Sequence, residues 1–156
     1  MTDKTCKERI EEEYESEMET LRTLWKNDCE GIEDSEDGNI FEHGLCFDYC
    51  YPTKRDAGYF RYQISWGGPS DEFRIYANQV KHGWEVYRIE YWFLDWFDGA
   101  SKTLHGEDFK FMKSFIESFF GETESMKYEF EKAMENYEPE EDDENKDEED
   151  IDTESN

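Results

Sequence analysis

The sequence predicts an α+β protein: an N-terminal helix, a four-stranded antiparallel meander sheet and two C-terminal helices that pack on the sheet. Near both ends of the 156-residue chain, apolar residues recur at spacings of three and four, as in amphipathic helices. Between residues 41 and 93 they alternate with polar residues, as in strands. Short connections between the alternating runs favour antiparallel hairpins. We expect one domain over residues 1–137.

The first helix is expected to begin at a capping box, Thr5-x-x-Glu8. An apolar stripe follows at spacings of four, four, three and four: Ile10, Tyr14, Met18, Leu21 and Trp25. This stripe predicts a helix of about 20 residues with one face on the sheet. The rest of its surface is acidic, with seven glutamates between residues 8 and 19, and an acidic loop follows at residues 30–39.

Four alternating runs predict the strands: about 41–51, Phe60 to Trp66, Phe73 to Ala77, and Trp84 to Phe93. Both faces of the last run carry large apolar side chains, so this strand is expected in the interior of the sheet or partly covered on each side. Between the second and third runs, Gly67-Gly68-Pro69-Ser70 must turn the chain, because Pro donates no ladder hydrogen bond and Gly adopts positive φ.

Two further amphipathic stripes predict the C-terminal helices. The first of them, Phe109 to Phe119, ends at Gly121, and the second begins near Thr123 or Ser125 and ends before Pro139. Residues 138–156 contain 12 acidic residues and one lysine, with Ile151 as the single large apolar side chain. Burial of one isoleucine cannot offset the entropy of ordering this segment, so we expect a disordered acidic tail.

The charge of the chain is strongly segregated. The net charge of −26 divides into −9 for residues 1–40, −3 for residues 41–120 and −14 for residues 121–156. Free DNA or RNA is therefore not expected as a partner, because phosphate binding needs clustered Lys and Arg. Basic proteins, including proteins that bind nucleic acid, are favoured. The sequence shows no signal peptide or membrane-spanning run, which predicts a cytoplasmic protein.

No arrangement of side chains predicts an enzyme, a metal site or a cofactor. The histidines, His43, His82 and His105, lack metal-ligand spacing and are expected on the surface or in turns. The cysteines are expected to be reduced and buried. A zinc site at His43, Cys46 and Cys50 is disfavoured, because a strand separates the two cysteines by about 13 Å.

Two further groupings could bind a ligand, and each also has a structural explanation. Asp95 and Asp98 could share a cation, although turn bonding by Asp is more common. The Gly67-Gly68-Pro69 turn could present Trp66, although a simple bend between strands is the favoured explanation. Asp71-Glu72 and Arg74, which follow it, are expected to face solvent or to form a local ion pair.

Part of the chain resembles a group of small acidic proteins, mostly uncharacterised, that are encoded on plasmids and prophages. The resemblance is carried by Gly58-Tyr-Phe-Arg-Tyr-Gln-Ile-Ser-Trp-Gly-Gly-Pro-Ser-Asp-Glu-Phe-Arg74 and by Arg88-Ile-Glu-Tyr-Trp-Phe-Leu-Asp-Trp-Phe-Asp-Gly99. It implies a mobile genetic element as the setting and brings no site residues with it. Mobile elements often encode small acidic inhibitors of host restriction or CRISPR systems, so the resemblance implies anti-restriction or anti-CRISPR activity.

The leading functional hypothesis is a non-enzymatic inhibitor that mimics DNA and binds a basic nucleic-acid-handling host protein. The seven glutamates of the first helix span roughly 17 Å, about one charge per 2.4 Å, against about one per 1.7 Å in duplex DNA. The alternative is an interaction module that uses exposed aromatic residues, with a tail that only solubilises. Against it, the first and third helices are expected to cover the aromatic cluster Trp92, Trp96 and Phe97. The candidate partner-binding residues are Glu8, Glu11, Glu12, Glu15, Glu19, Glu33, Asp34, Glu36, Asp37, Trp66, Trp92 and Trp96.

Overall fold

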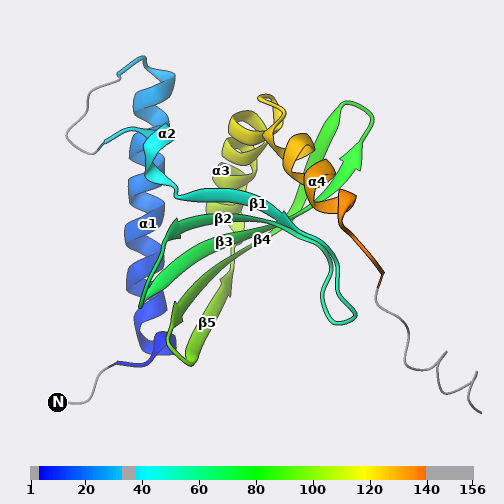
Figure 1. Ribbon diagram of the computed structural model, residues 1–156. Helices are drawn as coiled ribbons and strands as arrows, with labels where there is room; N and C mark the ends of the chain where they lie inside the picture. The colour runs from blue at the N-terminus through cyan, green and yellow to red at the C-terminus, as the bar shows by residue number, and fades with distance from the viewer. Residues whose placement is uncertain (1–3, 33–37, 140–156) are drawn as a thin grey trace, which may run out of the picture.

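A computed structural model describes residues 4–32 and 38–139, and it has an α+β fold built on an antiparallel sheet. Helix α1 precedes the sheet, and the C-terminal helices follow it (Figure 1). The strands are hydrogen-bonded in chain order as a five-stranded meander. The helices are α1 (Cys6–Cys29), α2 (Ile40–His43), α3 (Gly106–Ile116), the π-helix η1 (Glu117–Gly121) and α4 (Ser125–Glu135). The strands are β1 (Cys46–Cys50), β2 (Tyr59–Ser65), β3 (Ser70–Val80), β4 (Gly83–Asp95) and β5 (Asp98–Thr103).

Helix α1 begins as the sequence predicts. Thr5 is its N-cap, and the Thr5 hydroxyl accepts a hydrogen bond from the backbone N–H of Glu8 at 3.3 Å. The predicted apolar stripe faces the core: four of its five members are buried and Trp25 is half-buried. Trp25 packs edge-on against Phe115 of α3 at 5.2 Å between ring centroids. The stripe thus joins α1 to both the sheet and α3.

One face of the sheet is covered by helices, and its side chains form the core. Phe60, Ile75 and Ile89 lie opposite one another on β2, β3 and β4, and each is fully buried. Tyr62, Phe73 and Tyr91 form the next row of this covered face. Strand β4 lies between β3 and β5, which confirms its predicted interior position.

The prediction of four strands was wrong, because β5 pairs with β4 over Asp98–Thr103. The sequence of β5, Asp-Gly-Ala-Ser-Lys-Thr, has no large apolar residue and does not alternate. An edge strand at a two-residue hairpin can be held by its ladder hydrogen bonds alone, and these leave no hydrophobic pattern.

The predicted first strand also began too early. Residues 40–43 form α2, and β1 starts only at Cys46. The Asn39 side-chain oxygen caps α2 by accepting from the backbone N–H groups of Phe41 and Glu42, while Ile40 is buried beneath the turn. Helix α3 differs too: it ends at Ile116, and the predicted stop at Gly121 closes η1 instead.

Some predicted features fall outside the described residues. These are the acidic tail from residue 140 onward and four candidate binding residues, Glu33, Asp34, Glu36 and Asp37. Among the helices within residues 4–32 and 38–139, none has the length and apolarity needed to cross a membrane.

Candidate interaction surface at one end of the sheet

Three large aromatic side chains protrude from two neighbouring turns. Trp66 follows β2, and Trp96 and Phe97 connect β4 to β5. Both turns lie at the same end of the sheet, because β2 and β4 run in the same direction on either side of β3. Trp66 is 75%, Trp96 87% and Phe97 fully exposed. We call these three residues the aromatic end. The expectation that helices cover Trp96 and Phe97 was wrong, because the helices lie on the core face.

The backbone at the aromatic end is constrained. Trp96 has φ of 54°, a left-handed conformation that costs a non-glycine residue of order 1–3 kcal/mol. Gly67, with φ of 114°, supplies the positive φ that the other turn needs. A Cβ on Gly68 would lie 3.4 Å from Nε1 of Trp96, so the indole rests against the Gly-Gly turn. The two turns are therefore in contact.

The β4–β5 turn is also tied to the start of α1. Asp98 accepts a hydrogen bond from the backbone N–H of Cys6 at 2.8 Å, and Arg9 pairs with Asp95 at 3.3 Å. The Arg9 guanidinium lies 4.8 Å from the centre of the Phe93 ring. These contacts fix the backbone of the turn, and the side chains of Trp96 and Phe97 extend from it into solvent. Asp98 therefore accepts backbone hydrogen bonds at a turn and at a helix start, which is the alternative to a cation site that the sequence favoured.

A groove of about 490 Å³ runs from the aromatic end onto the open face of the sheet, the face without helices. Its lining includes Trp66, Trp96, Arg61, Gln63, Glu72 and Arg74. Gln63 and Glu72 are only 7% and 4% exposed. Of the two alternatives expected for Glu72, solvent exposure or a local ion pair, the structure shows the ion pair, with Arg74 at 2.9 Å.

Trp92, the third predicted tryptophan, does not belong to the aromatic end. It is half-buried, and its indole N–H donates to Glu90 at 3.1 Å. The Arg74 guanidinium stacks on its ring at 4.0 Å from the centroid. Trp92 therefore holds Arg74 in place beside the groove.

The acidic surface of α1 is less dense than the sequence count suggests. Glu11 pairs with Lys102, Glu13 with Arg9, and Glu17 with His43. The remaining four, Glu8, Glu12, Glu15 and Glu19, are exposed and form no ion pair within the described part of the chain. Their spacing of four, three and four places them along one acidic ridge, with roughly one charge per 5–6 Å.

Two polar groups that the sequence placed at the surface are partly or fully inside. His43 Nε2 lies 2.6 Å from Glu17 Oε1 between α2 and α1. The pKa of His43 is raised, mainly by this hydrogen bond.

Asp71 is buried and accepts from Tyr91 at 2.6 Å and from the Ser65 hydroxyl. The pKa of Tyr91 is raised by burial and by that bond. His43 thus joins α2 to α1, and Asp71 joins β3 to β2 and β4.

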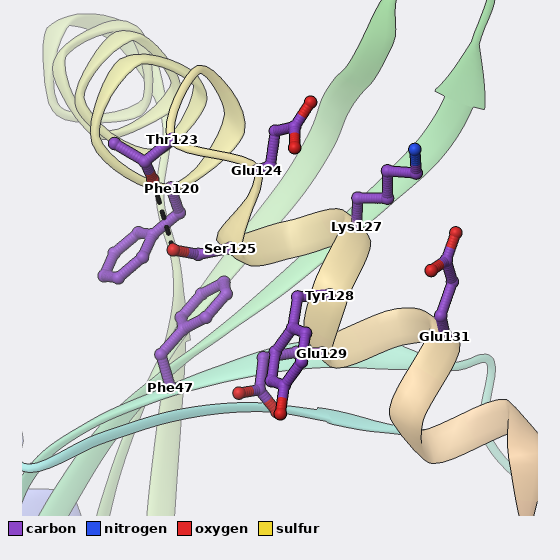
Figure 2. Close-up of a pocket in the computed structure, with 9 residues that line it drawn as sticks. All are labelled: Phe47, Phe120, Thr123, Glu124, Ser125, Lys127, Tyr128, Glu129 and Glu131. Carbon is purple, nitrogen blue, oxygen red and sulfur yellow. Dashed lines mark hydrogen bonds between the residues drawn. The ribbon is translucent and has the colours of Figure 1, made fainter.

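A second hollow of about 540 Å³ lies between β1, η1 and the start of α4. Figure 2 shows the Phe47 and Phe120 rings at its base, stacked at 3.9 Å, with the hydroxyls of Thr123 and Ser125 beside them. Glu124, Lys127 and Glu131 point away from these rings. The charged side chains do not converge on one point, so this hollow is a weaker candidate than the aromatic end.

No three His, Cys, Asp or Glu side chains within residues 4–32 and 38–139 are placed to hold a metal ion. The cysteines are free thiols. Cys6 is buried as expected, whereas Cys29 and Cys46 are exposed, which corrects the prediction for these two. Cys29 ends α1, and Cys46 opens the edge strand β1, so neither is covered by a neighbouring element.

No family model, curated protein or solved structure matches the chain.

The structure brings Trp66 and Trp96 to the same groove, whereas the sequence assigned them to two separate groupings. Phe97 was expected in a covered cluster with Trp92 and Trp96, and Gln63 was not selected. A Trp-Phe pair in a two-residue hairpin turn, where Asn and Gly are usual, indicates that the Phe97 side chain is exposed. Gln63 gave no signal, since a glutamine in an alternating strand is ordinarily solvent-exposed.

Proposed function

We propose that this protein is a non-enzymatic binding protein that engages a basic partner protein through the aromatic end. The observation that carries the proposal is the exposure of Trp66, Trp96 and Phe97 on turns that are anchored to α1. Exposed aromatic clusters mark protein contacts, and tryptophan is enriched among the residues that dominate binding energy. The isolated chain gains no stability from a strained, exposed Trp96.

The charge of the chain supports a basic protein as the partner. The chain carries a net charge of −26, and the acidic ridge starts beside the aromatic end because Cys6 and Arg9 hold the start of α1 against the β4–β5 turn. A surface of one sign attracts a partner of the opposite sign and raises the association rate. A basic protein with an apolar contact region fits both parts of this surface.

The test compares two pairs of exposed aromatic residues. Wild-type protein, the Trp96→Ala/Phe97→Ala variant and a matched Tyr87→Ala/Tyr128→Ala control are used as bait in lysate of the source cells, and affinities are then measured with the purified partner. Loss of two central anchors is expected to weaken binding about 100-fold or more, while the control binds as wild type does. Equal binding by all three would rule out the aromatic end.

A second candidate function is an anti-restriction or anti-CRISPR inhibitor that competes with DNA for a basic groove on a host defence protein. It is favoured by the exposed acidic ridge and by the sequence resemblance to mobile-element proteins. The Debye length falls from about 10 Å at 0.1 M salt to about 3 Å at 1 M, so binding by charge mimicry should weaken steeply with salt. Binding that is salt-sensitive, unaffected by Trp96→Ala and displaced by DNA would select this candidate over the first.

A further inference from the structure

The groove beside the aromatic end contains a carboxamide that opens to solvent. Gln63 lines the groove and is 7% exposed, and its side chain forms no hydrogen bond to any residue that the structure describes. Its amide atoms are not buried and unpaired, so they meet solvent in the groove. A ligand that enters the groove would replace this solvent as the hydrogen-bond partner of Gln63.

A second oxygen is open in the same groove. Glu72 uses Oε2 to accept from Arg74, and its Oε1 has no hydrogen-bond partner within the described residues. The acceptors Gln63 Oε1 and Glu72 Oε1 favour a ligand that is rich in donors.

The groove can also hold a cation although arginines line it. Arg61 is bound by Asp48 through two hydrogen bonds, of 2.7 and 3.1 Å. Arg74 is paired with Glu72 and stacked on Trp92. Each of these positive charges is thus already matched by a carboxylate. The net charge of −26 then makes the surroundings attractive to a further cation.

We propose that the groove receives an arginine side chain of the partner protein, an inference that rests on the proposed function. The guanidinium lies against the indoles of Trp66 and Trp96 and donates to the open oxygens of Gln63 and Glu72. The Gln63 NH₂ group donates to a main-chain carbonyl of the same partner segment. Arginine suits the groove better than lysine, because its planar guanidinium stacks on aromatic faces and presents five N–H donors.

The first test needs no partner protein. ¹⁵N-labelled protein is titrated with Nα-acetyl-L-arginine amide, and with the corresponding lysine compound, while the indole N–H signals of Trp66 and Trp96 and the Gln63 NH₂ signals are followed by NMR. We expect saturable shifts at these three residues, with an affinity at least about threefold higher for arginine than for lysine. No saturable shift, equal affinity for the two compounds, or shifts elsewhere would overturn the proposal.

Variants then test the role of the amide. Gln63→Leu keeps the side-chain volume and removes the polar atoms, and Gln79→Leu is the control at an exposed position of β3. Gln63→Leu should weaken the arginine compound about tenfold without lowering Tm, because an unpaired amide adds no stability. Trp96→Ala, a substitution on the surface, should weaken it as well. Unchanged affinity in either variant would contradict the arginine site.

The same variants separate this inference from the proposed function. If wild-type protein captures a partner and Gln63→Leu binds that partner equally well, the arginine site is wrong and the proposed function stands. If no partner depends on the aromatic end, and the arginine compound still binds at Gln63 and Trp96, the proposed function is wrong and the site stands.

Discussion

The two faces of the sheet differ in what holds their side chains. On the covered face, buried rings pack against one another and against helices: Phe73 lies 5.1 Å from Tyr91, and Tyr62 lies 6.1 Å from Phe115 of α3, between ring centroids. On the open face, charged side chains are held by ion pairs, such as Arg61 with Asp48, and the Gln63 side chain bonds to no other residue within 4–32 and 38–139. Aromatic residues at the end of that face stay in solvent. The covered face stabilises the fold. The exposed aromatic residues and the Gln63 side chain at the open face do not contribute to stability in this way.

Phenylalanine truncation on each face gives the largest expected contrast. Phe115→Ala removes a fully buried ring and is expected to cost about 3–5 kcal/mol of unfolding free energy. Phe97→Ala removes a fully exposed ring and should change that free energy by no more than about 0.5 kcal/mol. Urea unfolding of both variants measures the difference. A cost above about 1 kcal/mol for Phe97→Ala would show that its ring packs in the folded state.

Trp96→Gly is expected to stabilise the protein, whereas Phe115→Ala destabilises it. Glycine adopts the left-handed backbone of residue 96 without the penalty that tryptophan pays. We expect the folded state to gain about 1 kcal/mol or less, because added chain entropy in the unfolded state offsets part of the relief. Partner binding should fall at the same time. Thermal unfolding and affinity are measured on the same protein samples, and a loss of stability would indicate that the indole contact with Gly68 outweighs the strain.

Strong periodicity explains what the sequence predicted well. The α1 stripe and the interior position of β4 followed from many apolar residues at regular spacing. The sequence did not predict the fifth strand, because pairing through backbone hydrogen bonds leaves no local pattern of apolar residues. It did not predict the exposure of Trp96 and Phe97 either, because the face on which the helices pack cannot be read from a local pattern. The burial of Asp71 was missed for another reason. Asp71 alternates in phase with Phe73 and lies on the covered face, but a charged side chain in that position is ordinarily expected in solvent.

The junction of α1 with α2 gives a smaller, pH-dependent effect on the covered side. The pKa of His43 is raised above 6.5 by its hydrogen bond to Glu17, so the folded state binds a proton more tightly than the unfolded state. The resulting stabilisation is complete below about pH 6.5 and is lost as the pH rises through the folded-state pKa. Tm of wild type should therefore fall relative to His43→Gln as the pH rises above about 6.5. Parallel Tm profiles for the two proteins would contradict this assignment.

The smallest effect on stability is expected at the acidic ridge. Replacing Glu8, Glu12, Glu15 and Glu19 by Gln removes four exposed, unpaired charges, and each replacement should change stability by less than about 0.5 kcal/mol. The association rate with a basic partner should nevertheless fall, because steering depends on the summed field, and most of this fall should disappear at high salt. Stopped-flow measurements at low and high salt separate the two contributions. If the dissociation rate rises instead, the ridge lies inside the contact, and the acidic helix and the aromatic end form one binding surface.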